Sequence, residues 1–327
     1  MATYFFYNIN NYEEEHQKTK PKTKSKFIHN IVSFSPKLEN EILVTELIKE
    51  LIPYYYNHFY LFNTVKVLKI AEIDDTMERL DSATELEPLN RECLVTYNAK
   101  KLVYLDAYLK LLSETNLRKC FCQLIFFYKS LLNSITKLVD IRLLHNNISL
   151  DTLIVDEDAE LLFLTKFGST MDIRREKVLQ FCSNKENFST DDNLLPIEFH
   201  LLHYQIINDT SLSLNNIETV IKRVSQDSNT NQSVLSYFNK YINKTSDLIV
   251  TDMIKYADTW DNFAASAAFK SILTDLEENN SDKNKFISQF MKLLETNMSL
   301  NPTHRNTIAN TLEQFDSIVL AGDFKEL

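Results

Sequence analysis

The residues whose types could support chemistry gather in one polar stretch, residues 143–168. His145 is of the type that transfers protons, and the carboxylates Asp151 and Asp156 are of the type that accepts protons or holds Mg²⁺. Glu198 adds a further carboxylate downstream. These three carboxylates are the residues that could supply a base and metal ligands to an enzyme built on this stretch.

The chain contains two glycines, Gly168 and Gly322, where average usage would predict roughly twenty or more. Backbone amides approach a phosphate closely only where residues lack a β-carbon, so neither a P-loop nor a dinucleotide fingerprint can be assembled from two distant glycines. Functions built on a glycine-rich loop are therefore excluded.

Charge and cysteine spacing exclude other classes. The net charge of -10 disfavours general nucleic-acid binding, and no nucleic acid is expected as a partner. The four cysteines (Cys93, Cys120, Cys122 and Cys182) form neither paired C-x-x-C knuckles nor a dense disulfide framework, so no structural metal is predicted. No apolar run of 18 residues or more occurs, so we expect no membrane span or signal peptide and an intracellular or virion location.

Hydrophobic spacing predicts the elements that must position the polar stretch. Apolar residues at helical spacing predict a helix of about fifteen residues from Ser35 to Pro53, after an apolar strand within 27–34. Short runs at 65–70 and 93–97 read as strands. Apolar residues at helical spacing then predict helices over 102–112 and 117–139. The apolar runs 152–155 and 160–164, separated by a polar turn, predict a β-hairpin.

Two segments offer candidate partner-binding residues. Five lysines lie within the predicted loop 13–26 beside Pro21, either as a solvated loop or as a docking site for an acidic partner. Residues 205–257 look like an insertion that is either a tolerated surface excursion or a partner site anchored by Tyr237, Phe238 and Tyr241.

Residues 143–168 resemble the catalytic loop, the following hairpin and the metal-binding turn of eukaryotic-type protein kinases. Leu195–Glu198 is similar to the Ala-Pro-Glu motif of that family, and Asn301–Arg305 to its Asn-Pro-x-x-Arg motif. Asp258 and Trp260 resemble its Asp-x-Trp motif. The resemblance covers residues 35–320 and is most similar to the kinase-like proteins of large nucleocytoplasmic DNA viruses. It implies an α+β, two-lobed protein-kinase-like fold, with an N-lobe at 1–98 and a mainly helical C-lobe at 99–327.

The same resemblance implies that the catalytic positions are degenerate. The family's base falls on Asn147, its loop lysine on Ser149 and its metal-holding Asn on Thr152. Asp-Phe-Gly becomes Lys166, Phe167 and Gly168, which sets an ammonium where the main Mg²⁺ ligand would be. Mg-ATP binding is therefore not expected.

Structural positions of the family, by contrast, are kept. His145 and Phe167 fall on hydrophobic-spine positions, and Asp258 would accept hydrogen bonds from the catalytic-loop backbone. Glu198 and Arg305 would form a partly buried ion pair. Glu39, Glu41 or Glu46 could take the place of the helix glutamate, but the apolar strand before the helix offers no lysine partner, so a solvated helix face is favoured.

These residues predict a pseudokinase that works as an interaction or structural module. Its expected partners are proteins, viral structural proteins or a kinase among them, in a virus particle or the host cytoplasm. The alternative is an active serine/threonine kinase with non-standard catalytic residues. Nucleic-acid binding through Lys18–Lys26 is a third possibility, which the net charge of -10 disfavours.

Overall fold

The computed structural model describes residues 27–67, 92–188, 195–225, 232–279 and 285–322. The fold class is α+β: mainly helices, with small antiparallel sheets. The predicted loop 13–26, the polar loop between the predicted strands and the ends of the chain lie outside the described residues. No helix in the described ranges has the length and apolarity needed to cross a membrane.

The N-terminal elements follow the predicted order. Strand β1 (Phe27–Ser33) leads into helix α1 (Pro36–Leu51), whose first turn is capped by the Ser35 hydroxyl accepting from the Leu38 N–H at 3.1 Å. Strands β2 (Thr64–Val67) and β3 (Glu92–Asn98) complete an antiparallel sheet of order β1-β3-β2. The helix and both later strands were predicted, and the structure confirms them within the described residues.

A strand and two helices come next. The predicted helix at 102–112 is shifted, because β4 (Leu102–Tyr104) pairs with β6 before α2 (Leu105–Thr115) begins. Helix α3 (Leu117–Asp140) agrees with its prediction and buries a continuous apolar face. The predicted hairpin is β6 (Leu153–Asp156) and β7 (Leu161–Leu164), and β5 (Leu143–Leu144) pairs with β8 (Met171–Asp172).

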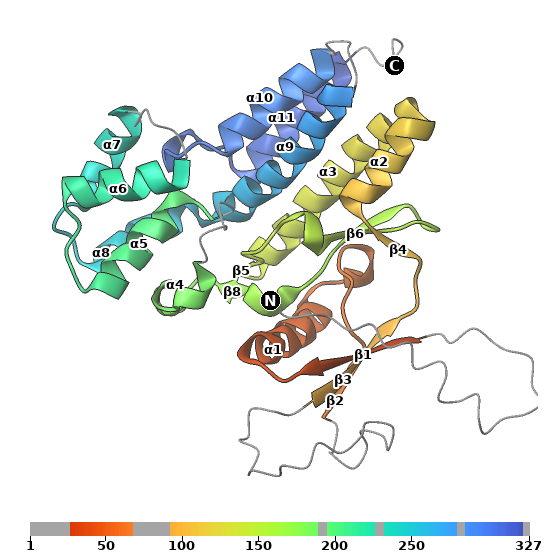
Figure 1. The fold of residues 1–327 in the computed structure, drawn as a ribbon, viewed down its shortest axis with the longest axis horizontal. Coiled ribbons are helices and arrows are strands. Elements are labelled where there is room, and N and C mark those ends of the chain that lie inside the picture. The colour runs from red at the N-terminus through yellow and green to blue at the C-terminus, as the bar shows by residue number, and fades with distance from the viewer. Residues whose placement is uncertain (1–26, 68–91, 189–194, 226–231, 280–284, 323–327) are drawn as a thin grey trace, which may run out of the picture.

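The rest of the chain is helical. Its α-helices are α4 (Arg175–Ser183), α5 (Ile197–Asn208), α6 (Leu214–Ser225), α7 (Gln232–Phe238), α8 (Ser246–Met253), α9 (Trp260–Asn279), α10 (Lys285–Asn297) and α11 (Ile308–Ala321). In Figure 1, α4–α8 form one group, α2, α3 and α9–α11 a second, and α1 with β1–β3 lies below the short strands that join them.

Buried apolar side chains divide into two clusters. The larger joins α1, α2, α3 and α9–α11, and at its centre the Tyr128 ring lies 4.8–4.9 Å from the rings of Phe269, Phe290 and Phe315. The smaller is built by α4–α8 and includes Trp260. The buried side chains of α1 thus belong to the same cluster as those of the long helices. This shared packing holds α1 next to the polar stretch.

The segment 205–257 corrects an expectation. It forms helices α6, α7 and α8, whose apolar faces build the smaller cluster, and is not a surface excursion. Phe238 and Tyr241 are buried there, and the Tyr241 hydroxyl donates to Asp252 at 2.9 Å. Tyr237 packs edge-on against Phe238. One of the two alternatives for this segment had these three rings as anchors for a partner. In the structure Phe238 and Tyr241 serve a local core instead.

Candidate functional site: the loop after β5 and the turn after β7

The loop after β5 is anchored by one buried carboxylate. Asp261 Oδ2 accepts from the His145 N–H at 2.7 Å, and Oδ1 accepts from the Asn146 N–H at 2.9 Å. Burial raises the pKa of Asp261 to about 6, against the opposing effect of these two hydrogen bonds. Asp258, for which this role was predicted, lies one turn earlier in η8 (Ile254–Thr259), where burial raises the pKa of its carboxyl. The prediction had the right interaction and the wrong residue.

His145 is held as a neutral, structural side chain. Its Nε2 lies 2.8 Å from the Thr165 carbonyl oxygen, which can only accept, so Nε2 carries the proton. Burial lowers the pKa of His145 to about 4. The His145 ring packs edge-on against Phe167 at 4.9 Å, and Phe167 against Phe59 at 5.6 Å. At neutral pH this histidine therefore contributes packing and no acid catalysis.

The turn after β7 carries the lysine that sequence analysis singled out. Lys166 has a left-handed backbone, with φ of 62°, and its Nζ donates to Asp151 Oδ2 at 2.6 Å. Asp151 also accepts from the Ser149 hydroxyl. Burial acts to raise the pKa of Asp151, but the hydrogen bonds from Lys166 and Ser149 outweigh it and lower that pKa. The structure brings Ser149, Asp151 and Lys166 together as one charge-paired group.

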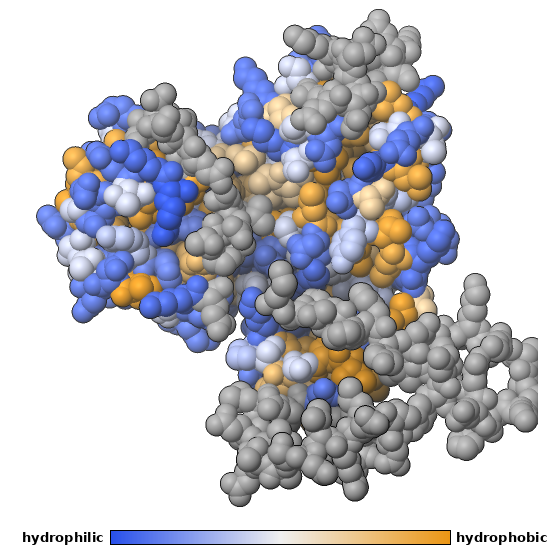
Figure 2. Space-filling view, in the orientation of Figure 1, coloured by the Kyte–Doolittle hydropathy of each residue, from blue (hydrophilic) through white to orange (hydrophobic). Residues whose placement is uncertain are grey.

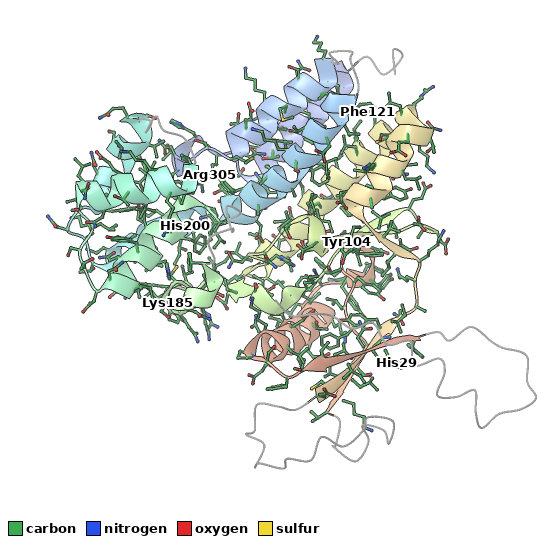
Figure 3. The ribbon with its side chains drawn as sticks, in the orientation of Figure 1. His29, Tyr104, Phe121, Lys185, His200 and Arg305 are labelled. Carbon is green, nitrogen blue, oxygen red and sulfur yellow. The ribbon has the colours of Figure 1, made fainter. Side chains whose placement is uncertain are left out.

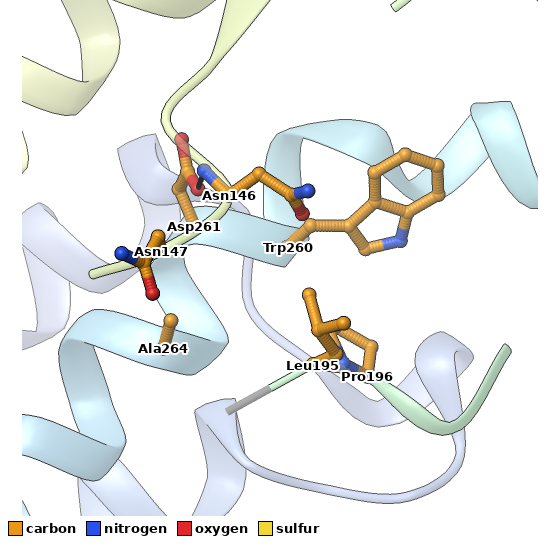
Figure 4. A pocket seen from close by; sticks show the side chains of 7 residues that line it. All are labelled: Asn146, Asn147, Leu195, Pro196, Trp260, Asp261 and Ala264. Atoms are coloured by element: carbon orange, nitrogen blue, oxygen red, sulfur yellow. Dashed lines mark hydrogen bonds between the residues drawn. The ribbon is translucent and has the colours of Figure 1, made fainter. Parts of the chain in front are cut away.

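Thr152 and Asn147 differ in what they do. Thr152 is buried, and its hydroxyl accepts from the Ser149 N–H at 3.0 Å and donates to the Ser149 carbonyl at 2.9 Å, so it closes the loop on itself. Asn147 lines a hollow of about 10 Å³, no larger than a water molecule needs, together with Asn146, Leu195, Pro196, Trp260, Asp261 and Ala264. Figure 4 shows the Asn146 side chain reaching between Asp261 and Trp260.

Helix α1 is fixed to the turn by its inner face. Asn40 Nδ2 donates to the carbonyl oxygens of Gly168 at 3.1 Å and Thr170 at 2.8 Å. A β-carbon added to Gly168 would lie 3.0 Å from the Lys37 carbonyl oxygen, so helix and turn touch as closely as glycine permits. Sequence reasoning missed Asn40, because a helical asparagine facing a distant turn carries no local signal.

Glu41 is the one of the three candidate glutamates that faces the turn. Burial raises the pKa of its carboxyl, opposed by a hydrogen bond from the Phe167 backbone and by the Lys166 charge. Glu39 is exposed, and Glu46 is an exposed partner of Lys49 at 3.0 Å. The solvated face predicted for these glutamates holds for Glu39 and Glu46 and is wrong for Glu41.

Two of the carboxylates that could serve an active enzyme are already engaged elsewhere. Asp156 pairs with Lys100 at 3.1 Å and accepts the N–H groups of the hairpin turn. Glu198 receives two hydrogen bonds from Arg305, at 2.7 and 2.8 Å, and a third from the Trp260 indole at 3.2 Å. The structure has the predicted Glu198–Arg305 pair, with both side chains 0% exposed.

The position of Arg305 explains what this pair does. Arg305 directly follows η9 (Pro302–His304) and lies where the α4–α8 group meets α9–α11 (Figure 3). Its Nε donates to the Ser299 carbonyl at 2.7 Å, so donors on both sides of the guanidinium are used. The pair therefore ties α5 to the C-terminal helices.

No protein-family model matches this chain, and no curated protein is significantly similar to it. In the described parts of the chain, no three His, Cys, Asp or Glu side chains come together as a group that could hold a metal ion.

We expect Arg305→Met to lower the free energy of unfolding by about 3–5 kcal/mol, because it leaves the Glu198 charge buried and unpaired. Urea denaturation measures this loss. The double variant Glu198→Gln, Arg305→Met should lose less than the sum of the single losses. Lys270→Met is the matched control: its ion pair with Glu295 is exposed, so it should cost at most about 1 kcal/mol. Equal losses for Arg305→Met and Lys270→Met would contradict the structural role.

Asp261 predicts a pH dependence of stability. The pKa of Asp261 in the folded state, about 6, lies above the usual aspartate value of 3.8, so between these pH values the folded state binds more protons than the unfolded state. The Asp261 contribution to stability therefore grows as pH falls from 7 towards 4. In urea titrations at several pH values, Asp261→Asn should remove this component, whereas Asp247→Asn, at an exposed carboxylate, should keep it. Parallel pH profiles for wild type and Asp261→Asn would argue against the assignment.

Proposed function

We propose that this chain is a protein-kinase-like protein without phosphotransferase activity, a pseudokinase with the two-lobed arrangement of that family, which acts by binding a protein partner. The observation that carries the proposal is the Lys166–Asp151 ion pair at 2.6 Å. In the alignment of Lys166, Phe167 and Gly168 with Asp-Phe-Gly, a cation stands at the metal-ligand position. Lys166 also pairs with Asp151, the carboxylate that could have replaced the missing metal ligand.

Electrostatics gives this observation its weight. At a separation of about 4 Å and an effective dielectric constant of about 20, a divalent and a monovalent cation repel by about 8 kcal/mol. Solvent reduces this repulsion, since Lys166 is partly exposed, but its sign does not change. Magnesium also requires hard anionic oxygen, and Asp156 and Glu198 are held by Lys100 and Arg305. The alternative, an active kinase with displaced carboxylates, thus lacks free ligands among these residues.

The arrangement of the elements supports the kinase-like part of the proposal. A strand, a helix and two more strands precede the helices, the sheet order is β1-β3-β2, and α1 contacts the turn at 166–168. The scaffold positions His145, Phe167, Glu198, Trp260 and Arg305 are paired or packed, while Asn147 and Lys166 cannot act as base or metal ligand. A scaffold kept without its chemistry is what a binding protein derived from an enzyme requires.

The partner in this proposal is a protein, either a viral structural protein or an active kinase, in a virus particle or the host cytoplasm. A surface role is consistent with the apolar residues that Figure 2 shows near α1 and β1.

We expect ATP with Mg²⁺ to leave the melting temperature of the purified chain unchanged relative to ATP with EDTA. A ligand that binds the native state must raise that temperature. At a concentration of a hundred times its dissociation constant, the ligand stabilises the native state by about 2.7 kcal/mol. Differential scanning fluorimetry measures this, with an active protein kinase as the positive control. A rise that depends on magnesium would overturn the proposal.

Reverting two positions tests how deep the loss of chemistry goes. The variant Lys166→Asp, Asn147→Asp should show no phosphorylation of itself or of a generic substrate, because the chain still lacks a glycine-rich loop and a lysine in the strand before α1. Radiolabelled phosphate transfer measures this. Lys270→Asp is the matched charge change on an exposed helix face. Transfer by the double variant, absent from the control, would show that the remainder of the site is competent.

A further inference from the structure

Helix α1 has an outer face of unusual composition. Leu43 is 65% and Leu51 46% exposed, whereas Leu47 between them packs partly against the larger apolar cluster. Beyond the helix end, Tyr54 is 68% and Tyr56 55% exposed, and their rings lie edge-on to each other. Monomeric proteins rarely leave large apolar side chains together at the surface without an occupant.

Exposed carboxylates surround Leu43 on the outer face of α1. Glu39, Glu46 and Glu50 are exposed and fall on the same side of α1, three or four residues from Leu43 or from one another. Lys49 pairs with Glu46 at 3.0 Å, and Lys37 is the other cation of the helix, so the helix as a whole remains acidic. An occupant of this face must therefore bring apolar side chains and positive charge.

We propose that residues 1–26 of this same chain supply that occupant and lie across the outer face of α1. Tyr4, Phe5, Phe6 and Tyr7 are the apolar group, and Lys18, Lys20, Lys22, Lys24 and Lys26 are the positive charge, with no acidic residue among them. Glu13, Glu14 and Glu15 separate the two groups. The segment thus offers both properties that the face requires.

Geometry permits the contact. Lys26 directly precedes β1, which is joined to α1 through Phe34 and Ser35. The 19 residue-to-residue steps from Tyr7 to Lys26 span about 63 Å when the chain is extended, and α1 is about 24 Å long. A second copy of the chain is a poorer occupant, because two such acidic faces repel each other.

Photo-crosslinking in the full chain tests the proposal. With p-benzoylphenylalanine at position 43, irradiation of the purified protein should give crosslinked peptides that join α1 to residues 1–26 within one chain. The same group at Leu320, 87% exposed on α11, or at Leu248, 58% exposed on α8, controls for indiscriminate capture and should give none. Crosslinks between two chains, crosslinks to other elements, or none from position 43 would each overturn the proposal.

A charge exchange separates specific docking from chance encounter. Lys22→Glu, Lys24→Glu should lower the crosslink yield from position 43 about fivefold, as expected for the loss of two surface ion pairs. Adding Glu46→Lys, Glu50→Lys should restore it. Yields that do not respond to either change would refute the electrostatic half of the proposal. Circular dichroism establishes that each variant is folded, and no result here depends on whether the chain binds nucleotide.

Discussion

A single buried carboxylate holds the polar stretch in place, and the other contacts of the site depend on it. Asp261 is almost fully buried, and it accepts two backbone N–H groups of the loop. Burying a charge is costly, but Asp261 stands in the first turn of α9, where the helix dipole favours a negative charge. The fixed loop holds His145 against Phe167, and Phe167 against Phe59 and the turn that α1 contacts. The anchor on α9 is thus linked to α1 by direct contacts.

Two ion pairs of the site differ in burial and therefore in what they contribute to the molecule. Glu198 and Arg305 are fully buried and bidentate, so each needs the other and neither is free to react. Lys166 and Asp151 are partly exposed, and their pair adds little stability. The Lys166–Asp151 pair matters for its charge. It places a cation at a turn where the resemblance to kinases would require an anion.

Local patterns predicted the elements well, because helices and strands follow from the spacing of apolar residues near one another in sequence. The helix at 36–51, the long helix at 117–140 and the hairpin were all predicted this way. Pairing across large sequence distances was predicted only where a motif identified both partners, as for Glu198 and Arg305. Asp258 was chosen over Asp261 because Asp258 has the Asp-x-Trp spacing to Trp260. The two carboxylates are three residues apart, so sequence alone does not tell which of them meets the loop. The aromatic residues of α7 and η7 (Asn239–Tyr241) were misplaced because exposure depends on the fold of α6–α8, which no local pattern gives.

Helix α1 presents two different faces over only four turns, and this has a thermodynamic consequence. Its inner face reaches the turn through Asn40 and Glu41, while its outer face carries Leu43, Glu46 and Glu50. A segment that binds the outer face better when α1 is seated on the turn must, by linkage, stabilise that seating by the same free energy. If residues 1–26 are that segment, as we propose, a protein partner that displaces them would loosen the turn at Lys166 without touching it. In the function proposed above, the position of α1 would then carry the response to the partner, and the response would require no nucleotide.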